Sequence, residues 1–421
     1  MFSIATSSSS SPLLINSRFN FTNSPKPLIP VAAMSSSSGF KTLTENFTVK
    51  VHKAENRELN VPLLSPFTIA SSRLDSVGNV AIRIELSGGG CVVGWGEAPI
   101  LPSVTAEDQP TAMVKAREAC EFLKELPEMK LGHVLEKIGG ILPGHRFASI
   151  VVNDLKVRAG VEMAVIDAAA KSVGVPLWKL FVPFHFFLSV CLMVELEIIP
   201  IVSPAEASKL ATKYREEGFK TLKLKVGKNL KADIEVLQAI REVHPTCSFI
   251  LDANEGYKTE EAVEVLEKLH EMKVTPVLFE QPVHRDNWEG LRRVTRVAKD
   301  RFGVSVAADE SCRDLTDLKK IIKDDVVDVV NIKLAKSGIL EALEVIELAR
   351  SSGIELMIGG MVETRLAMGF SGHLAAGIGC FRFIDLDTPL LLTSDPVQGG
   401  YKASGAVYEF TDEGGHGGYL Q

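Results

Sequence analysis

The stretch Thr221-Leu222-Lys223-Leu224-Lys225-Val226 (TLKLKV) is a short apolar run in which two lysines alternate with leucines. A charged stretch of helical character follows it, and the next apolar run, Phe249 to Asp252 (FILD), ends in a carboxylate. The same rhythm continues with Val277 to Glu280 (VLFE). Short apolar runs that alternate with helices predict parallel strands joined by helical crossovers.

Five more runs extend this series on both sides. Eight parallel strands are most often arranged as a closed (β/α) barrel, so we expect an α/β fold of this type; an open doubly wound sheet is the alternative. The predicted strands are Ile198 to Val202, Thr221 to Val226, Phe249 to Asp252, Val277 to Glu280, Val304 to Ala307, Val326 to Ile332, Glu355 to Ile358 and Phe381 to Ile384.

The part of the chain before this series has a different pattern. From Phe47 to about Glu97 the residues alternate as in antiparallel strands, and helical spacing follows over Thr105 to about Leu135 and over Leu155 to Val173. These features predict an α+β domain ahead of the barrel. The glycine-rich end, Gly399 to Gln421, is expected to fold back over that domain.

Composition and charge exclude some classes of partner. The chain has 421 residues, 46% of them hydrophobic and 24% charged, as in ordinary globular proteins. A net charge of −7 without any lysine and arginine cluster argues against a nucleic acid or an anionic membrane as a partner. The six cysteines are scattered without a C-x-x-C pair, so neither a zinc site nor a disulfide framework is indicated.

The first 44 residues differ sharply from the rest. They contain serine runs such as Ser7 to Ser11 and Ser35 to Ser38, and no acidic residue precedes Glu45. A serine-rich, acid-free N-terminus is typical of an organelle transit peptide and predicts a plastid location. An alternative start at Met34, which would give a cytoplasmic form, and a tail without an addressing function are the other interpretations.

The residues that end the predicted strands indicate a functional site. Functional side chains of a barrel lie at the carboxyl ends of its strands, and three consecutive strands here end in Asp252, Glu280 and Asp309. Three carboxylates at one mouth repel one another unless a cation neutralises them, and oxygen ligands suit Mg²⁺. A helix N-cap is the ordinary role of any one such residue, but the three in register predict a metal site.

Lysines occupy the neighbouring strand ends. Lys223 and Lys225 lie two residues apart and therefore share a face, while Lys333 enters from four strands away. Mutual repulsion and a nearby Mg²⁺ should lower a lysine pKa toward neutrality, as a general base requires. Two bases on opposite sides of a bound substrate can remove a proton from one face and return it to the other, which is the arrangement of a racemase or epimerase.

With these residues the sequence resembles the enolase superfamily, specifically the muconate lactonizing enzyme subgroup and its dipeptide epimerases of the L-Ala-D/L-Glu type. The resemblance extends from about Phe47 to Leu420. It rests on Gly94-Trp95-Gly96-Glu97, Lys223-Leu224-Lys225, Leu251-Asp252-Ala253-Asn254, Glu280-Gln281-Pro282, Ala308-Asp309-Glu310-Ser311 and Asn331-Ile332-Lys333.

The resemblance implies a fold and a set of roles. It implies a modified (β/α)7β TIM-like barrel at 191–395 and an α+β capping domain at 45–190 completed by 396–421, after a transit peptide at 1–44. Asp252, Glu280 and Asp309 would be Mg²⁺ ligands, Lys225 and Lys333 the acid/base catalysts, and Lys223 an electrostatic helper. The implied reaction is a 1,1-proton transfer at the α-carbon of a dipeptide through a metal-stabilised enediolate. A homo-oligomer is also expected.

The residues at the end of strand eight limit the class of possible substrates. Asp385-Leu386-Asp387 matches the Asp-x-Asp that binds the substrate α-ammonium group in dipeptide epimerases; a turn before Pro389 is the alternative interpretation. Arg73, within the segment Pro66 to Asp75, is a candidate for binding the side-chain carboxylate of a glutamate substrate. Strand seven lacks the histidine of sister subgroups, which disfavours mandelate-racemase-like and sugar acid dehydratase chemistry.

One stretch departs from the family. Phe181 to Val194 is almost wholly apolar with four phenylalanines, where relatives have a short link, so it indicates translated intron, a gene-model error or a genuine insertion. At this length it is too short to span a membrane.

Two alternative functions remain open for the whole chain. One is a cycloisomerase or o-succinylbenzoate synthase-like lyase of the same fold, and the other is a non-catalytic barrel.

Overall fold

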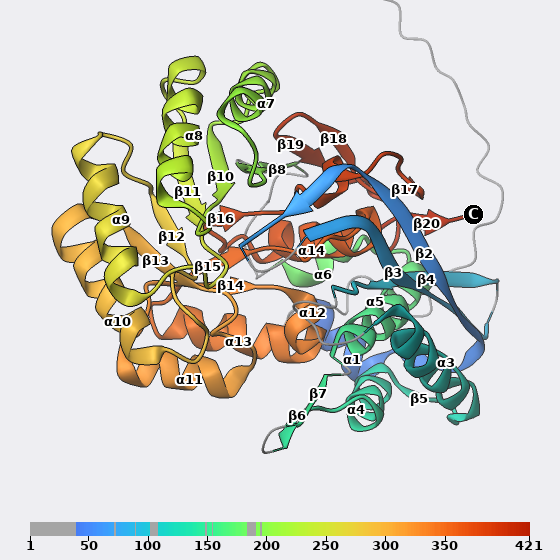
Figure 1. Ribbon diagram of the computed structural model, residues 1–421. Coiled ribbons are helices and arrows are strands. Elements are labelled where there is room, and N and C mark those ends of the chain that lie inside the picture. Colours follow the sequence, from blue (N-terminus) through green and yellow to red (C-terminus); the bar gives the residue numbers. More distant parts are fainter. Residues whose placement is uncertain are drawn as a thin grey trace, which may run out of the picture.

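A computed structural model describes residues 39–70, 73–88, 90–101, 108–147, 150–153, 155–182, 191–193 and 196–421. Within these residues the chain forms a curled parallel sheet with helices on its outside and a separate α+β unit packed beside it (Figure 1). No helix in the described ranges is long and apolar enough to cross a membrane.

The described residues contain one eight-stranded parallel sheet with the strands in chain order. Each strand overlaps a strand predicted from the sequence, because the apolar runs are buried between the barrel interior and the outer helices. The strands are β9 (Leu196–Ile199), β10 (Thr221–Lys225), β11 (Ser248–Asp252), β12 (Leu278–Glu280), β13 (Ser305–Ala308), β14 (Val329–Ile332), β15 (Glu355–Ile358) and β16 (Phe383–Ile384).

Seven strands are each followed by a helical segment, and the eighth is followed by a short 3-10 turn, η3 (Thr388–Leu391). This is the expected (β/α)7β order, so the predicted fold class is confirmed. The helical segments are α7 (Pro204–Glu216), α8 (Leu230–Val243), α9 (Thr259–Glu271), α10 (Trp288–Val297) with its π-helical extension η2 (Ala298–Phe302), α11 (Leu315–Asp324), α12 (Leu334–Ser337) with α13 (Ile339–Ser351), and α14 (Arg365–Ile378).

A side chain bridges the seam between the first and last strands. In the described residues β9 and β16 are the two ends of the sheet and share no ladder. The carboxylate of Asp387, just beyond β16, accepts a 2.7 Å hydrogen bond from the backbone N–H of Ile198 on β9. The seam is therefore joined by a side chain where the short β16 leaves no backbone partner.

The capping unit is built on an antiparallel sheet of β2 (Val51–Thr68), β3 (Arg73–Leu86) and β4 (Val92–Ala98). The expected helical region from Thr105 to Leu135 is two helices separated by the short β5 (Met129–Lys130), because Pro127 ends the first one. The cap helices are α3 (Gln109–Glu125), α4 (Leu131–Ile141), α5 (Leu155–Ser172) and α6 (Leu177–Phe181), with the small pairs β1 (Thr48–Val49) on β5 and β6 (Gly144–Phe147) on β7 (Ile150–Asn153).

Helix α5 lies directly on the backbone of β4. A Cβ atom at Gly94 would lie 2.0 Å from the carbonyl oxygen of Ala164, and one at Gly96 would lie 2.0 Å from that of Gly160. Both distances are far below van der Waals contact, so only glycine allows the helix to approach this closely. The glycines of the Gly94-Trp95-Gly96-Glu97 motif thus serve packing between a cap strand and a cap helix.

The start of the described chain corrects one expected boundary. Helix α1 covers Gly39–Asn46, and its Phe40 and Leu43 are buried. Residues 39–44, which lie within the transit peptide expected at 1–44, are helical because their apolar side chains pack into the cap core. The remainder of that segment, residues 1–38, lies outside the described residues.

The C-terminal segment returns to the capping unit. The buried imidazole of His416 lies 2.9 Å from the carbonyl oxygen of Trp95, and its backbone N–H donates to Asp167 on α5 at 2.9 Å. These bonds join the C-terminal segment to β4 and α5. Its strands are β17 (Val397–Gly399) paired with β20 (Gly418–Leu420), and β18 (Lys402–Ser404) paired with β19 (Val407–Glu409).

The Phe-rich stretch from Phe181 to Val194 lies mostly outside the described residues, which omit 183–190 and 194–195. Phe181 ends α6 and packs against Phe40 and Phe370, with ring centroids 5.1 and 6.5 Å apart. Beyond the gap, β8 (Cys191–Met193) pairs with β19. The ends of the stretch are thus integrated into the fold on both sides.

Candidate active site

The predicted residues meet at the carboxyl ends of the barrel strands. The parallel register places Lys225 beside Asp252 and Asp252 beside Glu280, so the three lie in one row across β10, β11 and β12. Asp309 directly follows β13 and Lys333 directly follows β14. All five side chains are buried. The row arises because parallel strands of similar length end at the same level.

Lys223 lies at the centre of the carboxylates. Its Nζ is 3.0 Å from Asp252, 2.7 Å from Glu280 and 2.7 Å from Asp385. The side chain is fully buried. A buried ammonium requires such compensation, and three acids around it also depend on it for charge balance.

Lys225 contacts one carboxylate and the cap. Its Nζ lies 2.6 Å from Oδ2 of Asp252 and 5.7 Å from the centroid of the Phe67 ring. Phe67 is near the end of β2, so the capping unit covers this lysine with an aromatic face. A cation over an aromatic face is a favourable contact, and the ring limits access of water.

Lys333 is paired with the carboxylate of Asp309. Its Nζ lies 2.7 Å from Oδ2 of Asp309, while Nζ of Lys336 lies 3.0 Å from Oδ1 of the same residue. Lys336 also donates to the backbone carbonyl oxygens of Asp309 and Asn331 at 2.9 and 2.7 Å. Lys336 is not among the site residues expected from the sequence, although it lies one helical turn after Lys333.

Two amide side chains also support the carboxylates. Asn331 donates to Glu280 at 2.8 Å. The side-chain oxygen of Gln281 accepts from the backbone N–H groups of Asp309 and Ser311 at 2.9 and 3.0 Å. Gln281 adopts φ +38°, a conformation that L-residues rarely adopt and that this bonding must hold in place. Both residues belong to the quoted motifs, but sequence reasoning assigned neither a role.

The charges of the site shift its acids in opposite directions. Burial alone would raise the pKa of Asp252, but Lys223 and Lys225 lower it to about 2. Burial would also raise the pKa of Asp309, which Lys333 and Lys336 bring below its ordinary value. Burial raises the pKa of Glu280 to about 7, and the charge of Asp252 adds to this rise.

Two lysines of the site have raised pKa values. Burial lowers the pKa of Lys223 and of Lys333, but the surrounding carboxylates outweigh it, so both pKa values are above the ordinary one. The lowering of a lysine pKa expected from the sequence rests also on a nearby Mg²⁺ and stays a prediction. At these lysines the electrostatic attraction of the surrounding carboxylates outweighs the repulsion between one lysine and another.

The donor set fits a hard divalent cation in its chemistry. Asp252, Glu280 and Asp309 supply only carboxylate oxygens, and ammonium groups at 2.6–3.0 Å show that the cluster is built around positive charge. No group of three or more histidine, cysteine or acidic side chains in the described ranges is arranged closely enough to be a ready metal site. In this arrangement the lysine ammonium groups contact the oxygens that a metal would use.

The Asp385-Leu386-Asp387 segment faces both the lysines and the seam. Oδ2 of Asp385 accepts from Lys223, and Oδ2 of Asp387 accepts from Ile198. The other oxygen of each carboxylate is buried without a hydrogen-bond partner among the described residues. Burial, with the charge of Asp385, raises the pKa of Asp387 to about 7. Both residues follow the end of β16 and lie outside the strand. Their spacing of two residues would place them on one face only within a strand.

Arg73 is not brought into this cluster by any contact in the described part of the chain. It is exposed at the start of β3, and its guanidinium donates to Asp75 at 3.1 Å. A hairpin tip is poorly determined by local sequence, which is why composition alone could not orient this side chain.

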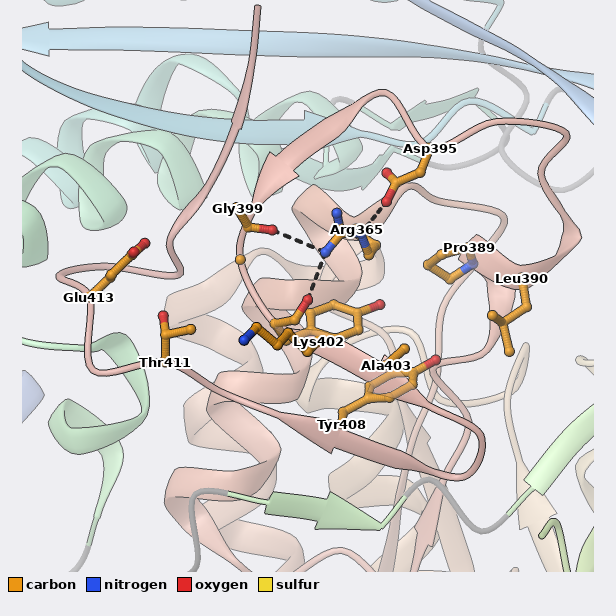
Figure 2. Close-up of a pocket in the computed structure, with 12 residues that line it drawn as sticks. Arg365, Pro389, Leu390, Asp395, Gly399, Lys402, Ala403, Tyr408, Thr411 and Glu413 are labelled. Carbon is orange, nitrogen blue, oxygen red and sulfur yellow. Dashed lines mark hydrogen bonds and ion pairs between the residues drawn. The ribbon is translucent and has the colours of Figure 1, made fainter. Parts of the chain in front are cut away.

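A cavity of about 750 Å³ lies elsewhere, between the start of α14 and the C-terminal segment. Figure 2 shows Arg365 pointing to the carbonyl oxygen of Gly399 and to Asp395. Arg365 also donates to the carbonyl oxygens of Tyr401 and Val397, so it ties the C-terminal segment to α14. None of the predicted site residues lines this cavity.

Comparisons with known proteins identify the family of the chain. Residues 206–420 match the family described as enolase C-terminal domain-like, and residues 52–181 match the mandelate racemase/muconate lactonizing enzyme N-terminal domain. The chain is 66% identical to an L-Ala-D/L-amino acid epimerase of Populus trichocarpa, over 94% of this chain and 93% of that protein.

Solved structures show the same fold. A substrate-liganded complex of the L-Ala-D/L-Glu epimerase from Bacillus subtilis has a TM-score of 0.79 at 31% identity, covering 88% of this chain and 98% of that one. A dipeptide epimerase from Enterococcus faecalis complexed with Mg and the dipeptide L-Leu-L-Tyr has a TM-score of 0.77 at 30% identity, covering 88% and 99%.

Proposed function

Because this chain belongs to the enolase superfamily, with domains of the mandelate racemase/muconate lactonizing enzyme type, we propose that it is an isomerase that epimerises dipeptides. The reaction would be a 1,1-proton transfer at the α-carbon of the second residue. The relatives support this class of reaction, since they are named as dipeptide epimerases, L-Ala-D/L-Glu epimerase or L-Ala-D/L-amino acid epimerase.

One observation carries the proposal. Lys225 and Lys333 stand four strands apart at one barrel mouth, each within 2.7 Å of a carboxylate of the same cluster. A substrate α-carbon between them can lose its proton to the neutral amine of one lysine and receive a proton from the ammonium of the other on the opposite face. This inverts the centre without net consumption of protons.

Asp252, Glu280 and Asp309 are the proposed ligands of a Mg²⁺ ion. When bound, the ion supplies positive charge at the substrate carboxylate, which stabilises the enediolate formed on proton removal. Asn331 orients the carboxylate of Glu280 through its hydrogen bond, and Gln281 holds the backbone N–H of Asp309. Lys223 is the proposed electrostatic helper, because it is the cation nearest to Asp252 and Glu280 together.

Asp385 and Asp387 are proposed to bind the α-ammonium group of the dipeptide. Each holds one buried oxygen without a partner among the described residues, and a buried carboxylate oxygen left unpaired is costly. A substrate ammonium would satisfy both oxygens by charge-assisted hydrogen bonds. Phe67 over Lys225 would exclude water from the proton-transfer side. Arg73 as a ligand of a glutamate side chain stays a prediction.

The test is proton exchange in D₂O. Purified protein with Mg²⁺ is incubated with L-Ala-L-Glu and with a panel of other dipeptides, and deuterium at the α-carbon of the second residue is measured by NMR. We expect exchange together with formation of the second epimer. In Lys333→Ala and Lys225→Ala, each variant should retain exchange on one epimer and lose it on the other.

Two outcomes would contradict the proposal. Absence of exchange with every dipeptide would remove the epimerase assignment, and the lyase or cycloisomerase alternatives of the same fold would then be tested with their own substrates. Persistence of exchange on both epimers in Lys333→Ala would leave the epimerase but refute the two-lysine scheme.

We also propose a plastid location, supported by the serine-rich, acid-free composition before Glu45. A fluorescent protein fused to residues 1–44 should enter chloroplasts, and a fusion that stays in the cytoplasm would favour the start at Met34. The domain limits 45–190 with 396–421 and 191–395 are proposed with α1 added to the cap, and the homo-oligomeric state stays a prediction.

A further inference from the structure

We infer that Glu162 in the capping unit is a positioning residue for Lys333 in the barrel. The inference rests on the proposed function, because it concerns the orientation of one of the two proposed acid/base lysines. It assigns a role in the reaction to a side chain that does not itself reach the substrate.

Glu162 is fully buried on α5 and binds the start of α13. Its Oε2 accepts a 2.5 Å hydrogen bond from the backbone N–H of Ile339, the first residue of that helix. Its Oε1 accepts from Nε of Arg158 at 2.8 Å. The first N–H groups of a helix have no partner within the helix, so the carboxylate acts as an N-cap supplied by another domain.

Only a short segment separates this bond from Lys333. Lys333 is the residue before α12, which is a single turn of four residues, and Gly338 joins α12 to α13. Gly338 adopts φ +77°, and a Cβ atom on it would lie 2.9 Å from Oε2 of Glu162. The carboxylate therefore packs directly against Gly338, at the junction between the two helices.

Backbone hydrogen bonds close the turn that carries Lys333. The backbone N–H of Lys336 donates to the carbonyl oxygen of Lys333, and that of Gly338 donates to Leu334, both at 2.9 Å. On the barrel side, Nζ of Lys336 holds the carbonyl oxygens of Asn331 and Asp309. The segment that carries Lys333 is thus anchored to the barrel at one end and to α5 of the cap at the other.

Glu97 provides a matched comparison. This buried carboxylate of β4 caps α14 in the same way, accepting from the backbone N–H of Thr364 at 3.0 Å and from its hydroxyl at 2.6 Å. It therefore joins the cap to the barrel by equally buried bonds. The segment that it holds follows β15 and contains neither of the two proposed acid/base lysines.

The experiment compares Glu162→Ala, Glu162→Gln and Glu97→Ala with the parent enzyme. Exchange of the α-proton in D₂O is measured from each pure epimer, and Lys333→Ala identifies the epimer that depends on Lys333. Since small misplacements of a catalytic group cost up to about 100-fold, we expect Glu162→Ala to lower exchange of that epimer at least about tenfold. Exchange of the other epimer should change less than about threefold, within the ordinary spread of such measurements.

Glu162→Gln keeps an acceptor oxygen and should recover most of the lost rate. Glu97→Ala should affect the two epimers alike. An equal loss on both epimers in Glu162→Ala, or the same selective loss in Glu97→Ala, would overturn the inference, since either would indicate general loosening between the domains.

A second variant covers the case in which Glu162→Ala does not fold. Ile339→Pro removes the N–H donor at the first position of α13, a position that proline often occupies, and leaves the carboxylate in place. Because the Ile339 side chain is itself buried, Ile339→Ala, which keeps the N–H, is the control for its loss. The proline variant should reproduce the selective loss, and unchanged exchange from both epimers would overturn the inference. If the parent enzyme exchanges neither epimer, the proposed function fails instead. Amide hydrogen exchange over 334–340 then still tests the anchoring, and unaltered protection in Ile339→Pro would refute it.

Discussion

The carboxylate of Asp387 accepts a 2.7 Å hydrogen bond from the backbone N–H of Ile198 across the seam between the last and first barrel strands. Its other oxygen is buried and has no hydrogen-bond partner among the described residues. One side chain therefore joins a structural bond to a proposed binding site for the substrate ammonium group.

Two substitutions distinguish the structural role of Asp387 from its proposed binding role. Asp387→Ala leaves the N–H of Ile198 buried without a partner and should lower the free energy of unfolding by about 1–3 kcal/mol. Asp387→Asn keeps an acceptor and should be close to the parent in stability. Both lose the charge, so kcat/KM for a free dipeptide should fall roughly 10- to 100-fold, the value of a charged hydrogen bond. Denaturant titration and kinetics check this, and an unchanged kcat/KM in Asp387→Asn would exclude the ammonium site.

The packing of α5 on β4 predicts a severe effect at Gly96. In Gly96→Ala the new methyl group would lie 2.0 Å from the carbonyl oxygen of Gly160, so the helix must move away from the sheet. We expect a loss of about 3 kcal/mol or more, or no folded protein, as for strongly overpacked cores. Gly140→Ala, in α4 with no described atom within 4 Å of the new methyl, should be neutral or stabilising by up to about 1 kcal/mol. Equal thermal stability of the two variants would contradict the packing argument.

The buried His373 predicts a pH dependence. Burial, with the neighbouring His416, lowers the pKa of His373 to about 3, and its Nδ1 accepts from the backbone N–H of Trp178 at 3.2 Å. The unfolded chain binds a proton there below about pH 6.5 while the folded protein does not, so this contribution to stability is lost as pH falls from 6.5 toward 3.

His373→Asn keeps an acceptor and removes the titration. Between pH 6 and pH 4 the parent should lose stability faster than this variant, by at most about 1.4 kcal/mol per pH unit. Urea titrations at several pH values give the difference. Parallel curves for the two proteins would show that the imidazole does not titrate differently on unfolding.

The carboxylate cluster predicts that Mg²⁺ and Lys223 stabilise the protein in the same place. Lys223→Met leaves Asp252, Glu280 and Asp385 without their shared cation, which should destabilise the fold by about 3–5 kcal/mol in EDTA. An ion that binds only the folded state stabilises it, so the proposed Mg²⁺ site predicts a larger rise in melting temperature on adding MgCl₂ in this variant than in the parent. Lys225→Met, which frees one contact with Asp252, is the control and should show a smaller change. The same rise in all three proteins would argue against metal binding at these carboxylates.

Much of the barrel was predictable because its signals are local. An apolar run of about five residues followed by a helix specifies a strand-helix unit, and β10 to β15 lie where the runs predicted them. Parallel strands then bring their carboxyl ends to one mouth, so the meeting of Lys225, Asp252 and Glu280 followed from the residues that close each run. The break between α3 and α4 was overlooked, although Pro127 marked it.

The sequence by itself determined the strand order and the residues that end each strand, because periodicity and chain connectivity are properties of neighbouring residues. Only the tertiary structure decided which buried carboxylate meets which donor. Glu162 caps Ile339 and Glu97 caps Thr364 across 177 and 267 residues of chain, and neither pairing leaves a local signal. Such partners are selected by burial: once packing removes water from a carboxylate, the nearest N–H must satisfy it, and that N–H is defined only by the folded chain.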